Sequence, residues 1–386
     1  MRFAFRTAGE ILFGRGESKK APELAARYGR RLFLVTGSAS VERSGLLAQL
    51  EEGLRQAGVS WVRWRVGREP DVDLVDAGAA LCRAESCDVV LAVGGGSALD
   101  AAKAISGLAT NPGSVQEYLE DLPGGDLRTV TNTPLPLLCV PTTAGTGSEV
   151  TRNAVIKVPA YSVKRSMRHD LLLPRVAIVD PDLIGSAPPS VIAAAGMDAL
   201  THLAESYLSR AANPMTDALA LPGLRLIIPA LRTLAAGSAT PETWEALALA
   251  SLWGGVCLAN AGLGAVHGLV APLGGCYEVP HGAGCAALLP AVTRTNLAAL
   301  RSRAPESPAL ARYAQLFAAF GASDEERGVA AVEGLVRALG IPPLRRYGVT
   351  AAGFARIIAG ARGSSMRGNP VELTDQELET VLSEAL

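Results

Sequence analysis

The first half of the chain alternates between short apolar runs and helical patterns. Apolar or β-branched runs bounded by Gly, Pro or Asp occur at residues 31–37, 60–66, 88–96, 135–143 and 175–180. Between several of them, as in residues 41–58 and 75–87, apolar residues recur at a spacing of three and four, which is typical of helices. A strand–helix–strand order that repeats in this way predicts a doubly wound, mostly parallel, Rossmann-like sheet.

The strand signal ends near residue 185. Beyond it, alanine- and leucine-rich helical segments predict an all-helical second domain. A chain of 386 residues exceeds the size at which one core keeps growing, so two domains are expected. The two prolines of residues 184–190 mark the boundary, and Ser190 is expected to cap the next helix. We predict an α/β domain over residues 1–184 and a helical domain over residues 185–386.

Charge and cysteine content exclude several classes of protein. The chain has 36 Lys plus Arg and 37 Asp plus Glu with no long run of either sign, so neither nucleic acid nor an anionic membrane is an expected partner. Charges interrupt the apolar residues at the N-terminus, and no uninterrupted apolar stretch reaches about 20 residues. The six cysteines have no CxxC spacing, which favours reduced thiols. We predict a cytoplasmic protein with a small-molecule partner.

A run of three glycines follows the apolar strand at residues 88–93. Gly94, Gly95 and Gly96 allow close approach of the backbone to a ligand, and Ser97 with the free amides of the next helix offers donors to a phosphate. The run is not GxGxxG, and a tight turn without a ligand is the alternative.

A second polar turn follows the strand at residues 135–141 and concentrates Thr142, Thr143, Thr146, Ser148 and Thr151 around two glycines. Its hydroxyls and amides, without the lysine of a P-loop, suit a diphosphate better than a transferable phosphate. Helix capping alone would explain either turn. Two such turns at the carboxyl ends of neighbouring strands predict a dinucleotide at the crevice of the sheet.

Three of the four histidines occur in the helical half together with one notable aspartate. Asp198 and His202 are four residues apart, so they share a helix face; His267 lies among small apolar residues; and His281 stands between a proline and a glycine. The ordinary alternative for Asp198 and His202 is a surface pair, and for His267 it is a buried core histidine. One carboxylate and three imidazoles predict a site for Fe²⁺ or Zn²⁺, with no thiolate to favour zinc alone.

The motifs resemble a known family when they are taken together. GGGSALDAAK, PTTAGTGSEVT, GMDALTHLAES, NAGLGAVHGLVAPLGG and VPHG follow one another in that order, and NPVELTDQELETVL ends the chain. This set resembles the iron-containing (group III) alcohol dehydrogenases over nearly the whole chain. The resemblance implies a dehydroquinate synthase-like architecture, with an α/β dinucleotide-binding domain, an all-α metal-binding domain and a catalytic cleft between them.

The resemblance also implies roles for individual residues. The metal ligands and catalytic residues would be Asp198, His202, His267 and His281. Lys164 would lie near the nicotinamide. With the glycine-rich turns included, the predicted cofactor-binding residues are Gly37, Ser38, Ser40, Gly94, Gly95, Gly96, Ser97, Asp100, Thr142, Thr143, Thr146, Thr151 and Lys164.

Two positions depart from the family pattern. Many members carry a proton-relaying histidine four residues after the third ligand, where this chain has Ala271. Many NAD-using members end the first strand with an aspartate that holds the adenosine ribose, where this chain has Gly37. Because Gly37 removes that charge and Arg43 follows, NADP(H) is expected as the preferred cofactor, with NAD(H) as the alternative.

These inferences predict an iron-type, NAD(P)-dependent alcohol dehydrogenase, an oxidoreductase acting on CH–OH. A divalent metal would act as a Lewis acid on the oxygen of a small alcohol, aldehyde or ketone, and hydride would pass to or from the nicotinamide. Alternatives of similar fold are a maleylacetate reductase, a hydroxyacid dehydrogenase, and glycerol dehydrogenase-like or dehydroquinate synthase-like enzymes. An inactive nucleotide- or metal-binding protein is the alternative from another class. We also expect a homodimer.

Overall fold

A computed structural model describes residues 2–37, 40–122, 127–363 and 365–386. The chain forms two compact units, Thr7–Ala187 and Pro188–Leu386, and the residues up to Arg6 pack with the second of them. There the backbone N–H of Arg6 donates a hydrogen bond of 2.6 Å to Asn260 Oδ1. The predicted division had assigned these first residues to the N-terminal domain.

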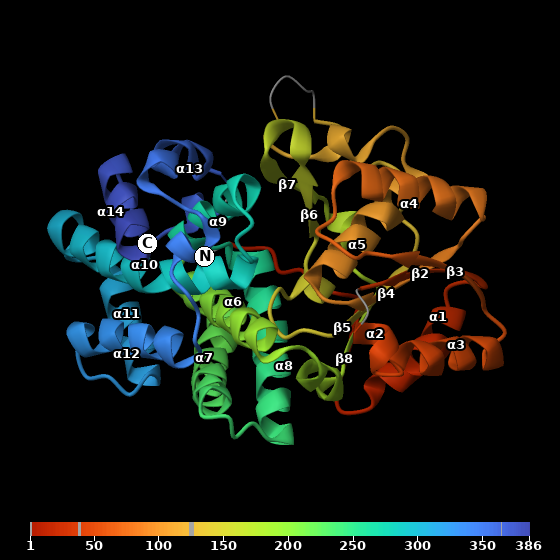
Figure 1. Ribbon diagram of the computed structural model, residues 1–386, viewed down its shortest axis with the longest axis horizontal. Helices are drawn as coiled ribbons and strands as arrows, with labels where there is room; N and C mark the ends of the chain where they lie inside the picture. The colour runs from red at the N-terminus through yellow and green to blue at the C-terminus, as the bar shows by residue number, and fades with distance from the viewer. Residues whose placement is uncertain (1, 38–39, 123–126, 364) are drawn as a thin grey trace. The chain divides into compact units, whose positions relative to one another are not determined.

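The first unit is built on a six-stranded parallel sheet with the strand order β1-β8-β5-β4-β2-β3 (Figure 1). Its strands are β1 (Glu10–Phe13), β2 (Arg31–Thr36), β3 (Ser60–Arg65), β4 (Val89–Gly94), β5 (Leu137–Pro141) and β8 (Val176–Val179). Each of the predicted apolar runs contains one of these strands. The doubly wound parallel sheet is therefore confirmed.

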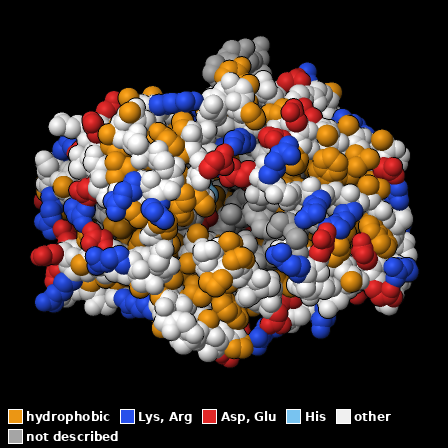
Figure 2. Space-filling view, in the orientation of Figure 1, with side chains coloured by type: hydrophobic (Ala, Val, Ile, Leu, Met, Phe, Trp, Pro, Cys, Tyr) orange, Lys and Arg blue, Asp and Glu red, His pale blue; other side chains and the backbone are white. Residues whose placement is uncertain are grey.

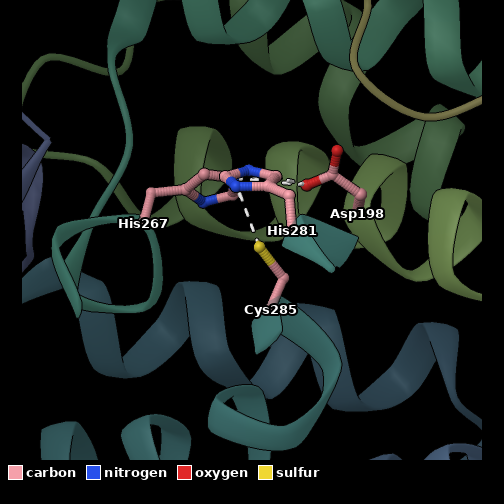
Figure 3. Close-up of side chains that lie close together, drawn as sticks. All are labelled: Asp198, His267, His281 and Cys285. Carbon is pink, nitrogen blue, oxygen red and sulfur yellow. Dashed lines mark hydrogen bonds and ion pairs between the residues drawn. The ribbon is translucent and has the colours of Figure 1, made fainter. Parts of the chain in front are cut away.

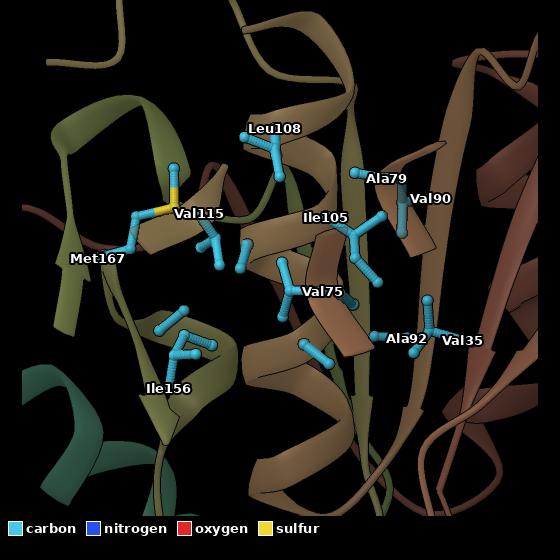
Figure 4. Packing of buried hydrophobic residues seen from close by; sticks show 14 of the residues in the cluster. Val35, Val75, Ala79, Val90, Ala92, Ile105, Leu108, Val115, Ile156 and Met167 are labelled. Carbon is cyan, nitrogen blue, oxygen red and sulfur yellow. The ribbon is translucent and has the colours of Figure 1, made fainter. Parts of the chain in front are cut away.

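Alternating side chains of the central strands fill two cores. On one face of β4, Val90 and Ala92 pack with residues of α4 and α5, including Val75 and Ile105 (Figure 4). On the other face, Leu91 and its alternate neighbours pack against α1 and α3. Strands buried on both faces have continuous apolar sequences, which is why their positions are evident from the sequence.

The helices of this unit are α1 (Ala21–Ala26), α2 (Ser40–Arg43), α3 (Leu46–Gln56), α4 (Val72–Ala84) and α5 (Gly96–Thr110). Its 3₁₀ helices are η1 (Glu17–Lys20), η2 (Val115–Tyr118), η3 (Ser148–Val150), η4 (Pro159–Tyr161), η5 (Asp170–Leu172) and η6 (Pro181–Ser186). The pattern at residues 41–58 suggested one helix, but Gly45 at φ 77° separates α2 from α3. Strand β1 and the antiparallel hairpin of β6 (Asn153–Val158) and β7 (Val163–Arg168) were not predicted from the sequence.

The second unit is helical throughout the part that the structure describes. Its α-helices are α6 (Pro189–Leu208), α7 (Pro214–Ala235), α8 (Pro241–Ala261), α9 (Ala265–Cys276), α10 (His281–Arg303), α11 (Pro308–Ala319), α12 (Glu325–Ala338), α13 (Phe354–Gly360) and α14 (Asp375–Ala385). Its 3₁₀ helices are η7 (Leu344–Tyr347), η8 (Ala351–Gly353) and η9 (Met366–Gly368). The expectation that Ser190 caps α6 is wrong, because the helix begins one residue earlier, at Pro189, whose fixed φ suits a first helical position.

Helix α6 is central to this bundle. It packs against α7, α8 and α10, while α10 also packs against α9, α12 and α14. Helix α7 has the length and mean hydropathy (1.4) of a membrane span, and α8 with α9 would qualify only as a pair bent by 99°. About 39% of the apolar window of α7 is buried, and the helix lies against α6 and α8, so one helix of this composition is weak evidence for a membrane span.

Charges of both signs are mixed on the molecular surface. On the face drawn in Figure 2, the described Lys and Arg side chains alternate with Asp and Glu, and no extended area carries a single sign. This distribution matches the formal net charge of −1. All six cysteines are free, and only Cys276 is more than slightly exposed.

Candidate metal centre and cofactor loops

Helix α6 presents three ionisable side chains on one face. Asp198, His202 and Glu205 are spaced by four and three residues, so they lie on successive turns of the same side. All three are buried, with exposed fractions of 2%, 4% and 6%. Burial of charged groups is expensive unless they are paired or bind a metal, so this face is a candidate functional surface.

Helix α10 begins with His281, and the glycine after it explains how this histidine reaches α6. A Cβ atom on Gly282 would lie 2.1 Å from the carbonyl oxygen of Ala194 and 3.3 Å from Cβ of Asp198. Only glycine permits this approach of the two helices. The unusual Pro–His–Gly sequence therefore places an imidazole, 41% exposed, beside Asp198.

The predicted metal ligands converge on one oxygen atom. Asp198 Oδ1 lies 3.6 Å from His202 Nε2, 3.4 Å from His267 Nε2 and 3.6 Å from His281 Nε2. The rings of His202 and His267 stack with centroids 4.6 Å apart. Figure 3 shows Asp198, His267 and His281 pointing toward one another.

The chemistry of these donors fits a divalent cation. Asp198 Oδ1 is buried and accepts no hydrogen bond from the described residues, which is costly for a carboxylate. Donors about 2.0–2.2 Å from a tetrahedral zinc ion are about 3.3 Å apart, close to the observed separations. Burial alone raises the pKa of Asp198, but His202, His281 and His267 outweigh it, so the pKa lies well below its usual value.

Glu205 orients His267 from the side away from Asp198. Its Oε2 lies 2.7 Å from His267 Nδ1, and its two oxygens accept the backbone N–H groups of Val266 (2.7 Å) and His267 (3.3 Å) at the start of α9. A proton on Nδ1 leaves the Nε2 lone pair facing Asp198, which is the arrangement of metal-binding histidines. Glu205 was not predicted from the sequence, although its place one turn beyond His202 was a usable signal.

A thiol lies at the same centre. Cys285 follows His281 by one turn of α10, and its Sγ is 3.7 Å from His267 Nε2 (Figure 3). One donor atom each from Asp198, His267, His281 and Cys285 all lie within 4.8 Å of one another. The sequence analysis did not place a thiol at this site, since Cys285 belongs to none of the motifs that pointed to it. Burial raises the pKa of the Cys285 thiol to about 12.

The two glycine-rich turns of the first unit lie side by side at the carboxyl ends of β4 and β5. Thr142 N–H donates to the carbonyl of Gly94 (2.9 Å), and a Cβ atom on Gly96 would lie 2.6 Å from Thr146 Cγ2. Gly37, at the end of β2, donates to Val93 O (2.9 Å). The side chains that remain partly accessible around these turns are Ser97, Thr142, Thr143 and Thr146. The sheet thus offers the anion-binding edge that a dinucleotide requires.

Lys103 anchors the second turn from within the protein. This lysine of α5 is fully buried, and its Nζ donates to Ser148 O (2.8 Å), Ser148 Oγ (3.0 Å), Thr151 Oγ1 (3.0 Å) and Asn153 O (2.7 Å). Asp100, one turn earlier, accepts a 2.6 Å hydrogen bond from Ser148 Oγ. Asp100 and Thr151, both predicted to bind the cofactor, therefore have partners inside the protein that hold the turn in place.

The other predicted cofactor residues are placed as follows. Lys164, on β7, pairs with Glu69 at 2.5 Å, and only 10% of its side chain is exposed. Ser40 begins α2, while Ser38 lies outside the described residues. His169, the histidine left unassigned, caps η5 by accepting the N–H of Leu171 at Nδ1 (3.2 Å).

Sequence profiles of known families match both halves of the chain. The profile described as iron-containing alcohol dehydrogenase matches residues 8–181, and that of the Fe-containing alcohol dehydrogenase family, C-terminal, matches residues 192–386. The chain belongs to the iron-containing alcohol dehydrogenase family. It is an oxidoreductase that acts on CH–OH groups, as predicted from the sequence.

Individual relatives of this iron-containing alcohol dehydrogenase are similar over nearly their whole length. 1,3-Propanediol dehydrogenase from Klebsiella pneumoniae is 36% identical over 364 residues, 92% of each chain. NAD-dependent methanol dehydrogenase from Bacillus methanolicus is 31% identical over 383 residues, 97% of each chain. The solved structure of a 1,3-propanediol oxidoreductase has a TM-score of 0.90 at 34% identity and 100% coverage of both chains. These likenesses confirm the predicted family and fold class.

Proposed function

We propose that this iron-containing alcohol dehydrogenase interconverts small primary alcohols and aldehydes at a metal held by Asp198, His202, His267 and His281. The convergence of three imidazole nitrogens on the buried Asp198 Oδ1, at 3.4 to 3.6 Å, carries this proposal. When bound, the metal supplies a Lewis acid for the alcohol or carbonyl oxygen, and the nicotinamide supplies or accepts hydride.

The chain contributes orientation and proton positions. Glu205 keeps a proton on His267 Nδ1, so that Nε2 offers its lone pair. Ala271, one helical turn after His267, carries no group that exchanges protons. We therefore propose that the substrate proton leaves through water. Ala271→His would then shift the pH–rate profile and leave the metal content unchanged; an unchanged profile would count against this route.

The metal requirement is tested with two histidine variants. His267→Ala should lose the bound metal and the dehydrogenase activity, because three remaining donors hold the ion far more weakly. His169→Ala is the matched control, since this side chain only caps η5. Full turnover by a chelator-treated sample that metal analysis shows to be metal-free would refute the proposed centre and would point to a mechanism without the metal.

The names of some relatives support a substrate class. Two of them are named for 1,3-propanediol and one for methanol, which favours short primary alcohols and diols. A panel of short alcohols, diols, aldehydes, hydroxyacids and maleylacetate, assayed with both cofactors, tests this choice. Higher kcat/KM for hydroxyacids or maleylacetate than for the alcohols would favour those activities instead.

We propose a preference for NADP(H) over NAD(H). Gly37 leaves the end of β2 without a carboxylate, and a Cβ there would meet Gly94 Cα at 3.4 Å, an ordinary contact. Arg65 is exposed and is the β3 residue paired with Thr36, the last residue of β2. Arg43, the last residue of α2, is close to Gly37 in the sequence. Either side chain could supply a cation to a 2′-phosphate. Gly37→Asp should move the kcat/KM ratio toward NAD(H), and a clear NAD(H) preference of the wild type would refute this proposal.

We propose a homodimer. Strand β1 lies at the edge of the sheet with Ile11 38% exposed, and an edge strand offers backbone groups to a second copy of the chain. Light scattering coupled to size-exclusion chromatography should give twice the 39.9 kDa chain mass, and a monomer mass would contradict it.

We propose a cytoplasmic location, supported by six cysteines that are all free. Cell fractionation with an antibody against the protein tests it, and recovery with secreted or membrane fractions would contradict it.

A further inference from the structure

The metal centre contains one more donor than the four proposed ligands. Asp198 Oδ1 lies 3.4 to 3.6 Å from Nε2 of His202, His267 and His281, and Cys285 adds a sulfur 3.7 Å from His267 Nε2. We propose that Cys285 is an alternative ligand that replaces His202 when the centre holds zinc. This inference rests on the proposed metal centre and deepens it, since it concerns which metal the centre selects.

The separations fit a mixed sulfur–nitrogen site. A thiolate about 2.3 Å and an imidazole about 2.0–2.1 Å from a tetrahedral zinc ion lie about 3.6 Å apart. The observed 3.7 Å between Cys285 Sγ and His267 Nε2 is close to this value. Donor atoms of Asp198, His267, His281 and Cys285 all lie within 4.8 Å of one another, which groups the sulfur with the proposed ligands.

A second observation separates Cys285 from an ordinary buried cysteine. Asp198 Oδ1, in a residue only 2% exposed, faces the cluster without accepting a hydrogen bond from the described residues. A buried carboxylate oxygen without a hydrogen bond is expected to have a cation as its partner. His267 Nε2 contacts both this oxygen and Cys285 Sγ, so the sulfur belongs to the same cluster.

The helices present two interchangeable sets of donors. His281 and Cys285 are one turn apart on α10, just as Asp198 and His202 are one turn apart on α6. Asp198, His267 and His281 belong to both sets. The fourth position would be filled either by the His202 imidazole or by the Cys285 sulfur.

The chemistry of the exchange needs no oxidant. On binding the ion, the Cys285 thiol would lose its proton, which water carries away, and the sulfur lone pair would form a bond to the ion in place of the bond to His202 Nε2. Thiolates favour zinc, whereas imidazole and carboxylate suit iron as well.

Cobalt substitution tests the sulfur ligand directly, because Co²⁺ replaces zinc and reports on thiolate binding by its spectrum. The wild-type protein loaded with Co²⁺ should show a thiolate-to-cobalt charge-transfer band in the near ultraviolet, and Cys285→Ser should lose it. Cys257→Ser is the matched control, since Cys257 is also fully buried but lies on α8 against Thr216 O. Absence of the band in the wild type, or its loss in Cys257→Ser alone, would overturn the proposal.

Metal affinities provide the second measurement. Anaerobic equilibrium dialysis of Cys285→Ser should show zinc bound at least about tenfold more weakly, while Fe²⁺ affinity changes by less than about threefold. Cys285→Ala, checked for folding by circular dichroism, serves if the serine variant is unstable. Zinc affinity equal to that of the wild type in both variants would overturn the proposal.

The His267→Ala variant separates a failure of the alternative ligand from a failure of the proposed metal centre. If this variant loses zinc and iron but the Cys285 variants keep wild-type affinities, only the alternative ligand is wrong. If His267→Ala itself binds both metals as the wild type does, the proposed metal centre is wrong, and the alternative ligand with it.

Discussion

At the residue scale, Glu205 fixes the orientation of His267. Its carboxylate accepts hydrogen bonds from His267 Nδ1 at 2.7 Å and from two backbone N–H groups of α9, so it holds both the ring and the helix that carries the ring. Gly264, at the N-cap of α9, makes room for it, since a Cβ there would lie 2.8 Å from Glu205 Oε1.

We expect Glu205→Ala to weaken metal binding by about 10- to 100-fold, the usual effect of removing the partner of a metal-binding histidine. Glu205→Gln should fall between this variant and the wild type, because an amide oxygen still accepts the Nδ1 proton without the charge. Equilibrium dialysis with Zn²⁺ measures both. Equal affinities for the three proteins would show that His267 needs no orienting partner.

Glu149 gives stability a predictable dependence on pH. It is 2% exposed, and burial raises its pKa to about 7, against the smaller opposing effects of its own backbone hydrogen bond and Lys103. Because its pKa is higher in the folded than in the unfolded chain, its contribution to stability is fully present below the unfolded pKa of 4.5 and is lost as the pH rises through about 7.

We therefore expect Glu149→Gln to be more stable relative to the wild type at pH 8 than at pH 5, by about 1–3 kcal/mol. Urea unfolding of both proteins at the two pH values gives this difference. Glu23→Gln, at an exposed glutamate of α1, is the control and should show no such change. A Glu149→Gln effect that is the same at both pH values would contradict the assignment.

The crossing of α6 and α10 is the decisive contact at the element scale. Gly282 lies against the carbonyl of Ala194, where a Cβ would be 2.1 Å from the oxygen. Backbone cannot move aside as a flexible side chain can, so any larger residue separates the helix that starts with His281 from the helix that carries Asp198.

We expect Gly282→Ala to destabilise the protein by about 1–3 kcal/mol and to weaken metal binding, since overpacking forces backbone shifts. Gly334→Ala is the matched control: Gly334 is inside α12, and a Cβ added there would have no described atom within 4 Å, so alanine should be neutral or stabilising by up to about 1 kcal/mol. Thermal unfolding and zinc dialysis measure both effects. A Gly282→Ala protein with wild-type affinity would show that the close crossing is dispensable.

The sequence predicts the strands whose side chains are buried on both faces of the sheet. Strands such as β4 are buried on both faces and read as continuous apolar runs. Strand β1 has four residues at the sheet edge, and the β6–β7 hairpin carries charges such as Lys157 and Arg165, so neither has that signal. The histidines stood out as candidate ligands in the sequence because the chain has only four of them. Cys285 did not stand out, because only the packing of α10 against α9 brings its sulfur to His267.

At the scale of the whole molecule, the proposed metal and cofactor sites draw on different units. The donors on α6, α9 and α10 all belong to Pro188–Leu386, whereas the glycine-rich turns after β4 and β5 belong to Thr7–Ala187. A ligand stabilises the structure that it binds, by about 2.7 kcal/mol at a concentration of 100 times its Kd. Each ligand should therefore leave its own pattern of protection along the chain.

Hydrogen exchange measured by mass spectrometry can resolve these patterns. Zn²⁺ added to the metal-free protein should slow amide exchange in α6, in the first turns of α9 and in α10, because the ion joins side chains from all three helices and suppresses their local opening. NADP(H) should slow exchange at residues 94–99 and 142–148, because we propose that backbone amides and hydroxyls of these two turns bind its phosphates. Protection by zinc at residues 94–99 with none in α6, α9 and α10 would contradict the assigned metal centre. NADP(H) protection confined to the helical unit would contradict the assigned cofactor loops.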